Sequence, residues 1–195
     1  MSILVLGLLI FLGMHSLRMV APTWRERQRA RLGEKRWKAL FAVVSLVGFV
    51  LLCYGFGMAR RHAVLLYVPP LWLQHLNALF TLVAFVLVAA ARIPRNHLKA
   101  AVGHPQVLGV KVWAFGHLLA AGGLHDVVLF GAFLLWSVAL FAVSRRRDRQ
   151  AGVTYPAGTL AGDLKVAVVG ALAWAVFAFW LHRVLIGVDP MAGMH

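Results

Sequence analysis

Long apolar segments that end in basic residues constrain the fold of this chain more than any other feature of its sequence. Of its 195 residues, 62% are hydrophobic, and the mean hydropathy is +0.81. An α-helix needs about 20 apolar residues to cross the hydrocarbon core of a bilayer. The pattern therefore predicts an all-α, polytopic transmembrane bundle of six helices, over residues 2–20, 37–58, 71–91, 105–121, 124–143 and 164–188.

The composition also limits the class of protein. A short chain that uses most of its residues in membrane segments has no room for a large soluble domain, so residues 1–195 are predicted to form one integral membrane domain. A net charge of +14 would indicate nucleic acid binding in a soluble protein. Here the basic residues flank apolar segments, where they set topology, and no nucleic acid partner is expected. The single Cys53 excludes an intrachain disulfide and a thiolate-held iron–sulfur cluster.

The basic residues are divided unequally between the loops. With the residues at the edges of the spans included, eight Lys and Arg residues lie around the loop after the first predicted span, four around the loop after the third and five around the loop after the fifth, against three on the other side of the membrane. By the positive-inside rule, the richer side is cytoplasmic and both termini are expected outside. Basic residues follow the first apolar segment instead of preceding it, which favours a retained span over a cleaved signal.

Two polar segments are expected at the cytoplasmic surface. Residues 22–36 are typical of an interfacial amphipathic helix, since Pro22 suits a first helical turn and Trp24 and Trp37 suit the headgroup region. Residues 144–163 are expected to form a polar loop and not a domain. Within the spans, small residues let helices approach closely; glycines occur there at positions 7, 13, 48, 55, 57, 116 and 170.

Histidines inside the predicted spans limit the function most. An ionisable side chain in hydrocarbon is costly and is rarely kept without a partner. Neutral imidazole also ligates metals, including haem iron. The set therefore predicts a membrane-embedded haem or metal site; the alternative is that each imidazole only forms a hydrogen bond across a helix interface. The four are His15, His75, His117 and His182.

Depth along the helices favours one pair of these histidines. His15 lies three residues before Arg18, about 4.5 Å along a helix axis. His117 lies six residues after Lys111, about 9 Å along the axis. Because the first and fourth spans run in opposite directions, both histidines are expected at comparable depth in the inner half of the bilayer. A porphyrin can then lie between them, with one axial imidazole on each side.

The other histidines are assigned by their positions. His75 and His182 are expected nearer the outer surface, as a second candidate pair. His104 is expected at the cytoplasmic mouth; it lies 13 residues before His117, about 20 Å along a helix, so the two cannot share one iron. It is the alternative inner ligand. Surface positions are expected for His62, His97, His125 and His195.

Few carboxylates are placed to do chemistry inside the membrane. Most of the six acids fall in cytoplasmic segments, so paired-carboxylate acid–base catalysis is not expected. Asp126 follows His125 at the start of the fifth predicted span. Its carboxylate either orients that imidazole or is an acid placed at a helix N-terminus, and the second interpretation is favoured.

Ordered motifs along nearly the whole chain resemble the NnrU family of bacterial membrane proteins. They are Gly13-Met14-His15-Ser16-Leu17-Arg18, Ala21-Pro22-Thr23-Trp24-Arg25, Leu32-Gly33-Glu34 with Trp37-Lys38, His104-Pro105-Gln106-Val107-Leu108-Gly109-Val110-Lys111, Gly116-His117-Leu118-Leu119-Ala120, Leu129-Phe130-Gly131, Arg146-Arg147-Asp148-Arg149 and Trp180-Leu181-His182. The resemblance implies a multi-pass protein of the bacterial inner (cytoplasmic) membrane, associated with nitrogen-oxide metabolism (denitrification) or redox metabolism.

The same domain is similar to plant zeta-carotene isomerase, and this resemblance implies a cofactor. It implies haem b, with iron held by two histidines from a His-Ser motif and an Ala-His-Thr motif. The first corresponds to His15 in His15-Ser16, and the second to His117, whose flanking residues depart from the isomerase pattern. Haem binding therefore transfers more safely than isomerase chemistry.

Two other functions stay open beside a haem-binding redox protein. One is a haem-dependent cis–trans isomerase of a polyene or another lipid-soluble substrate; the other is a haem-free structural or accessory factor. A weaker resemblance, of His104-Pro105 with Gly109 to membrane methyltransferases, lacks the paired acids that those enzymes have downstream. No catalytic residue is assigned. Enzymatic turnover and assembly into a homo-oligomer are left open, and membrane lipid is the expected surrounding.

Overall fold

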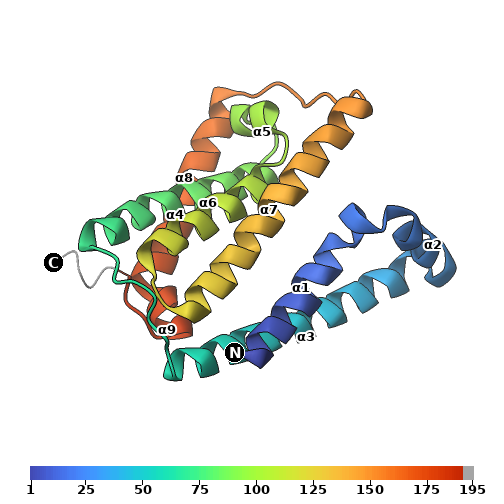
Figure 1. The fold of residues 1–195 in the computed structure, drawn as a ribbon. Helices are drawn as coiled ribbons and strands as arrows, with labels where there is room; N and C mark the ends of the chain where they lie inside the picture. Colours follow the sequence, from blue (N-terminus) through green and yellow to red (C-terminus); the bar gives the residue numbers. More distant parts are fainter. Residues whose placement is uncertain (191–195) are drawn as a thin grey trace. The chain divides into compact units, whose positions relative to one another are not determined.

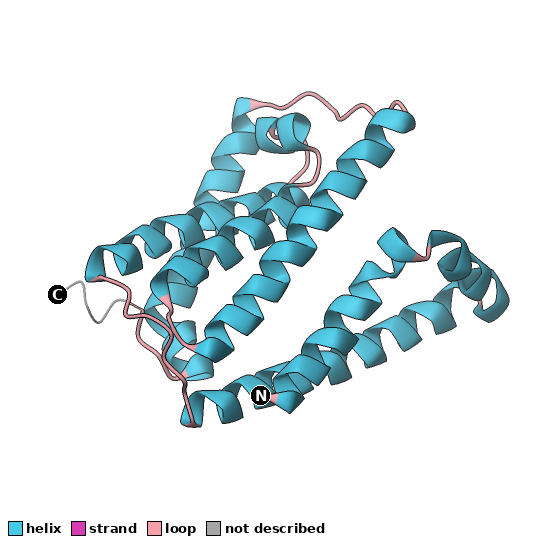
Figure 2. Cartoon of the chain, viewed as in Figure 1, coloured by secondary structure: helices cyan, strands magenta, loops and turns pink. Residues whose placement is uncertain are grey.

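The computed structural model describes residues 1–190, and in that part it consists of helices and loops without a strand (Figure 1, Figure 2). The predicted all-α class is confirmed for these residues. The helices are α1 (Ser2–Val20), α2 (Pro22–Leu32), α3 (Glu34–Arg61), α4 (Leu71–Arg92), α5 (His97–Val102), α6 (Pro105–Ala120), α7 (Leu124–Gln150), α8 (Leu160–Val176), the π-helical turn η1 (Phe177–Leu181) and α9 (His182–Ile186).

Five helical segments among the described residues are long and apolar enough to cross a membrane. They are α1, α3, α4, α7 and the continuous segment Leu160–Ile186 made of α8, η1 and α9. The chain is therefore a multi-pass membrane protein. The fourth predicted span, over residues 105–121, corresponds to α6, which has only 16 residues. Such a helix is about 24 Å long, less than the roughly 30 Å of a hydrocarbon core, so this span stays a prediction.

Two predicted boundaries differ from the structure. The polar loop expected at residues 144–163 is partly helical, because α7 continues to Gln150 through arginines, which favour helix, and α8 begins at Leu160. The helix expected over residues 22–36 ends at Leu32. Gly33 has φ +77°, a conformation that ends one helix and starts the next.

The described chain divides into two compact units. The first comprises Met1–Leu66 and Gly123–Trp136, and the second comprises Tyr67–Gly122 and the chain from Ser137 onward. Helix α7 contributes its first half to one unit and its second half to the other. A single domain over residues 1–195 stays a prediction.

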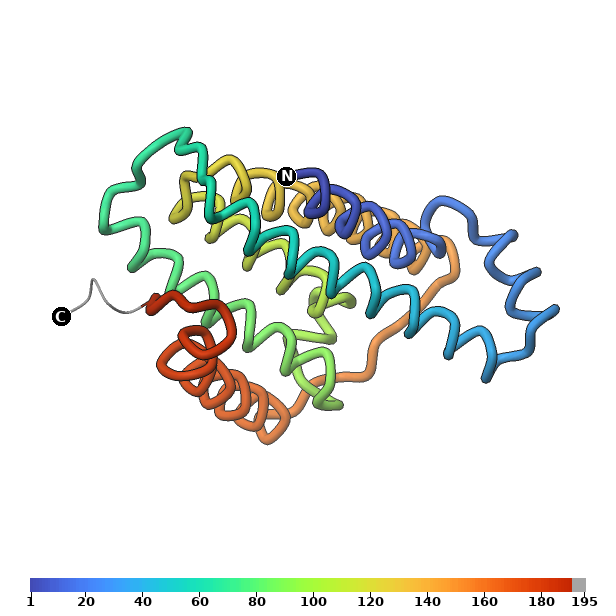
Figure 3. The backbone as a smooth tube through the Cα atoms, turned by 90° about the horizontal axis from the view of Figure 1, so that it is seen from below, coloured from blue at the N-terminus to red at the C-terminus, as the bar shows by residue number. Residues whose placement is uncertain are grey.

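Close packing of α1 on α3 forms the first unit (Figures 1 and 3). Glycines on both helices make the contact: Gly7 faces Leu52, and Gly55 faces Leu4 about one turn away. A Cβ atom at either glycine would collide with the backbone of the facing helix. The helices are therefore antiparallel, and they approach closely because glycine offers no side chain, as the sequence predicts for positions 7 and 55.

Helix α4 is the centre of the second unit, where it packs against α6 and α8. Gly109 of α6 faces Ala84, and Gly170 of α8 faces Val86. The buried Asn96 then ends the α4 segment: its Nδ2 donates to the carbonyls of Ala90 and Ile93, and its Oδ1 accepts from the Lys99 backbone to cap α5. These contacts, all within the unit, hold the histidine-bearing helix α6 against α4.

The glycine contact predicts a position-specific effect of a single methyl group. Gly55→Ala should lower the free energy of unfolding by about 1–3 kcal/mol, because its Cβ would overlap the α1 backbone at Leu4. The matched control is Gly57→Ala on the same helix, where nothing lies within 4 Å of an added Cβ. Thermal unfolding of the detergent-purified proteins measures both, and equal melting temperatures would contradict the packing described.

Candidate functional site

Three of the four histidines predicted to lie within spans form a hydrogen bond through the same ring nitrogen. The Nδ1 atom lies 2.7 Å from the Phe11 carbonyl in His15, 2.9 Å from the Trp113 carbonyl in His117 and 2.8 Å from the Val188 carbonyl in His182. A carbonyl oxygen can only accept, so Nδ1 carries the proton in each bond and the lone pair lies on Nε2. A hydrogen bond from Nδ1 to a backbone carbonyl is typical of histidines that ligate metals through Nε2.

Aromatic rings surround His15 within the first unit. The ring centroids of Phe11 and Phe41 lie 4.3 and 5.1 Å from that of the imidazole, and the centroid of Trp136 lies at 6.3 Å. The neighbouring Ser16 hydroxyl donates to Leu12 and accepts from Trp136 Nε1 at 3.1 Å. Helices α1, α3 and α7 therefore give this imidazole an apolar, aromatic environment, which suits a haem or another flat apolar ligand.

A buried polar atom without a hydrogen-bond partner among the described residues lies on α3, the helix that provides Phe41 next to His15. The buried hydroxyl of Ser45 has no hydrogen-bond partner within residues 1–190. On α3 it lies between Phe41, which contacts His15, and Gly48, which faces Phe11. Each buried polar group of this kind needs an explanation, and a bound group that accepts from or donates to the hydroxyl is one.

His117 lies on α6, beside the closest contact of α6 with α4. A Cβ atom at Gly116 would lie 2.5 Å from Asn77 Oδ1, and that oxygen is buried without a hydrogen-bond partner in the described chain. The Trp113 ring lies 5.1 Å from the imidazole. This second histidine therefore also combines an aromatic neighbour with an unsatisfied polar atom nearby.

A π-helical turn precedes His182. The turn η1 (Phe177–Leu181) joins α8 to α9, and the Phe177 ring packs 5.8 Å from the His182 imidazole. Such turns are rare and frequently occur at functional sites. His182 interacts electrostatically with His117, so the two imidazoles lie near each other within the second unit.

The structure groups the candidate ligands by unit. His15 belongs to the first unit, whereas His117 and His182 belong to the second. The pairing of His15 with His117 stays a prediction. His75 is exposed on α4 and makes no hydrogen bond within residues 1–190; its pairing with His182 also stays a prediction.

His104 takes part in a polar cluster with residues that the sequence does not single out. Its Nε2 lies 2.6 Å from Asp148 Oδ2, and the Tyr155 hydroxyl donates to the same oxygen. Asp148 lies in the polar extension of α7 beyond the apolar span, and Tyr155 lies in the loop that follows. Partial burial and the neighbouring Asp148 carboxylate raise the pKa of the Tyr155 hydroxyl. The cluster connects the start of α6 to the end of α7, and only tertiary contacts reveal it.

Among the histidines expected at the surface, His62 and His97 are exposed, and His97 Nδ1 lies 2.6 Å from Asp163 Oδ2. The prediction for His125 is wrong, because this residue is only 6% exposed and its Nδ1 has no partner in the described chain. Leu124 N donates to Val64 O and draws the loop toward α3, where the Phe56 ring covers the imidazole. His195 lies outside the described residues.

Asp126 performs the role favoured from the sequence. Its Oδ2 accepts from the Gly123 backbone at 3.1 Å, so the carboxylate satisfies an N–H group at the start of α7. Its Oδ1 also lies 3.5 Å from His125 Nε2. The orienting role weighed as the alternative is therefore compatible with the geometry, at the long end of a hydrogen-bond distance.

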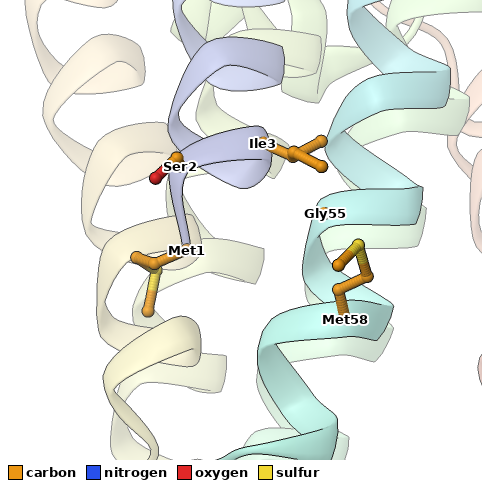
Figure 4. A pocket seen from close by; sticks show the side chains of 5 residues that line it. All are labelled: Met1, Ser2, Ile3, Gly55 and Met58. Atoms are coloured by element: carbon orange, nitrogen blue, oxygen red, sulfur yellow. The ribbon is translucent and has the colours of Figure 1, made fainter.

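Among the described residues, the histidines form neither a cluster of three or more metal ligands nor the lining of the pocket in Figure 4. Among residues 1–190, no group of three or more His, Cys, Asp or Glu side chains is arranged to hold a metal ion. Figure 4 shows a pocket of the first unit that is lined by Met1, Ser2, Ile3, Gly55 and Met58.

Comparison with known protein families gives one match that covers nearly the whole chain. The sequence model described as NnrU protein matches residues 3–190. The chain belongs to the NnrU family. No curated protein and no solved structure matches it. In this NnrU family protein, the matched region includes every histidine discussed above except His195.

The His104 cluster predicts a pH-dependent contribution to the stability of this NnrU family protein. The Tyr155 hydrogen bond, with His104 and Arg145 nearby, lowers the pKa of the Asp148 carboxyl below its usual range. A carboxyl whose pKa is lowered by folding stabilises the folded state above its unfolded pKa, and this contribution is lost as the pH falls through the folded value. Asp148→Asn should therefore cost about 1 kcal/mol at neutral pH, and the difference should shrink below about pH 4.

Thermal unfolding across this pH range measures the effect. Tyr155→Phe should weaken the cluster at neutral pH, whereas the matched change Tyr54→Phe, at a residue that is 61% exposed, should leave the melting temperature nearly unchanged. An Asp148→Asn difference that grows on acidification would show that the carboxylate does not stabilise the fold in the way described.

Proposed function

We propose that this NnrU family membrane protein binds haem b through His15 and His117 and serves nitrogen-oxide or redox metabolism in the inner membrane. The observation that carries the proposal is the shared hydrogen bond of the imidazoles, in which Nδ1 donates to a backbone carbonyl and the lone pair lies on Nε2. The proposed ligands therefore have the tautomer that iron ligation requires.

The surroundings of the two residues support the same cofactor. Aromatic rings from α1, α3 and α7 lie around His15, and Trp113 lies beside His117. The unsatisfied Ser45 hydroxyl can donate to a propionate, and the unsatisfied Asn77 Oδ1 can accept from a small ligand that carries a donor. When bound, haem supplies one-electron chemistry, and the protein tunes it through the axial imidazoles, their hydrogen bonds and the exclusion of water.

His182 is the strongest rival for one axial position. It forms the same hydrogen bond through Nδ1 and belongs to the same unit as His117, with which it interacts electrostatically. The motif that carries the family resemblance favours His15 as the ligand that pairs with His117, whereas the location of His117 and His182 within one unit favours His182. The variants below separate the two assignments, and both are compatible with haem.

Absorption spectra test whether the protein binds haem. Protein purified in detergent from haem-replete cells should show a Soret band and, after reduction with dithionite, the sharp α band of low-spin haem b. Two strong-field imidazoles fill both axial positions in that state. Purified protein without Soret absorption would reject the haem proposal in favour of a haem-free accessory role.

Single substitutions then identify the ligands. His15→Ala and His117→Ala should each lose haem or convert it to the high-spin form, because removing one imidazole opens an axial position. His62→Ala is the matched control, since His62 is exposed at the end of α3, and it should leave the spectrum unchanged. If His15→Ala stays fully loaded and low-spin while His182→Ala loses haem, His182 is the ligand and our assignment of His15 is wrong.

We also propose that both termini face outward and that the loop at residues 151–159 faces the cytoplasm, as the excess of basic residues on that side indicates. In a Cys53→Ala background, Val64→Cys and Val153→Cys introduce single thiols into two loops at valines that are 56% and 47% exposed. A membrane-impermeant maleimide added to intact cells should label the first and not the second. The opposite labelling pattern would reverse the topology.

A further inference from the structure

Helix α2 is a short polar segment between two apolar helices. It lies at the far end of the α1–α3 pair from the N-terminus (Figures 1 and 3), and none of its residues is buried. It contacts both α1 and α3 within the first unit. The environment at this end of the α1–α3 pair therefore also surrounds α2.

The segment formed by α2 and the first turns of α3, residues 22–38, contains two acids, and both form ion pairs. Glu26 pairs with Arg25 and Arg29, and Glu34 pairs with Arg29 and Lys38. No further carboxylate of the segment remains to pair with its other cations. The two carboxylates thus pair with three of the basic residues, and the remaining basic residues give the segment a surplus of positive charge.

Four exposed cations form that surplus, and we call them the α2 basic patch. Each is exposed to solvent and none forms an ion pair within residues 1–190. The patch consists of Arg27, Arg31, Lys35 and Arg36.

The positions of these cations are unfavourable for the protein alone. Arg27 and Arg31 are four residues apart on α2, so their like charges lie on one face of the helix and repel. Lys35 and Arg36 lie in the first turn of α3, where the helix dipole is positive and favours acids. A bound anion relieves both repulsions.

Two tryptophans indicate where that anion lies. Trp24 of α2 and Trp37 of α3 pack edge to face with centroids 6.3 Å apart; Trp37 is buried at 4% exposure, whereas Trp24 remains 47% exposed. Exposed tryptophan is enriched at the level of lipid headgroups. The apolar parts of α1 and α3, which are long enough to cross a membrane, adjoin the same region, so the patch lies where a span would leave the hydrocarbon core.

We propose that the α2 basic patch binds the phosphate groups of acidic phospholipids such as phosphatidylglycerol. Clusters of four or more Lys and Arg residues directly beside a membrane span are typical of such recognition. Each guanidinium can also hold a phosphate oxygen pair through two parallel hydrogen bonds. The assignment does not depend on haem, because none of the four residues of the patch is a proposed haem ligand.

Lipid titration by native mass spectrometry tests the proposal on the full-length protein in detergent. Phosphatidylglycerol should bind to the unchanged protein, and the Arg27→Gln/Arg31→Gln variant should bind it about 30-fold more weakly. That factor corresponds to about 2 kcal/mol, or about 1 kcal/mol for each cation lost near acidic lipid. Arg31→Gln alone, a milder change in the exposed last turn of α2, should weaken binding about fivefold.

The control variant removes the same charge from the other end of α3. Arg60→Gln/Arg61→Gln changes two exposed arginines in its last turn and should keep the original affinity for phosphatidylglycerol. Equal weakening by the two double variants would overturn the proposal, since it would indicate attraction by net charge alone. Melting temperatures without added lipid show that each variant is folded.

Two further probes separate a lipid site from a general anion site. Phosphatidylcholine, which has no net charge, should bind the unchanged protein more weakly than phosphatidylglycerol and should not distinguish the variants. Inorganic phosphate at matched concentration should not raise the melting temperature. Stabilisation by inorganic phosphate that the Arg27→Gln/Arg31→Gln variant abolishes would identify a soluble anion as the ligand and would refute the lipid proposal.

Discussion

Backbone hydrogen bonding in a medium without water is the constraint on which the rest of this structure depends. In hydrocarbon an unpaired amide or carbonyl is costly, so a spanning segment must satisfy its own backbone, and the helix does so. The same constraint limits what a polar side chain can do inside a helix. His15 and His117 direct Nδ1 to the carbonyl one turn earlier, which is the nearest acceptor. A requirement of solvation thus also sets the tautomer of the candidate ligands.

Helix contacts through glycine place these side chains. Without a hydrophobic force between helices in lipid, close packing of small residues replaces it. The contact of Gly48 with Phe11 lies one turn of α1 from His15, and α3 presents Phe41 to that imidazole. In the second unit Gly116 packs against Asn77, directly before His117. Packing and candidate chemistry therefore share the same helix faces.

The sequence predicts those features that depend on local pattern. Hydropathy predicts both bounds of α1 correctly, because an apolar run that ends near Arg18 has few alternative structures. The motifs predict the family that residues 3–190 match. The sequence fails for His125, whose burial arises from the contact of its loop with α3, and for the contacts of His104 with Asp148 and Tyr155. These depend on residues more than 40 positions apart in the chain, as with His104 and Asp148. No periodic pattern encodes such contacts.

The π-helical turn before His182 has a consequence for how this part of the chain tolerates length changes. Trp174 is fixed to Thr81 by a 3.0 Å hydrogen bond on one side of the turn, and His182 follows on the other. A π-turn amounts to one extra residue in an α-helix. Because the wide turn absorbs that residue, deleting one residue there would restore regular helix and leave the later side chains, His182 included, on nearly the same helix face. The same deletion in the regular part of α8 would rotate every later side chain by about 100°. The turn is therefore the place in this segment where the chain can lose a residue without redirecting the His182 imidazole.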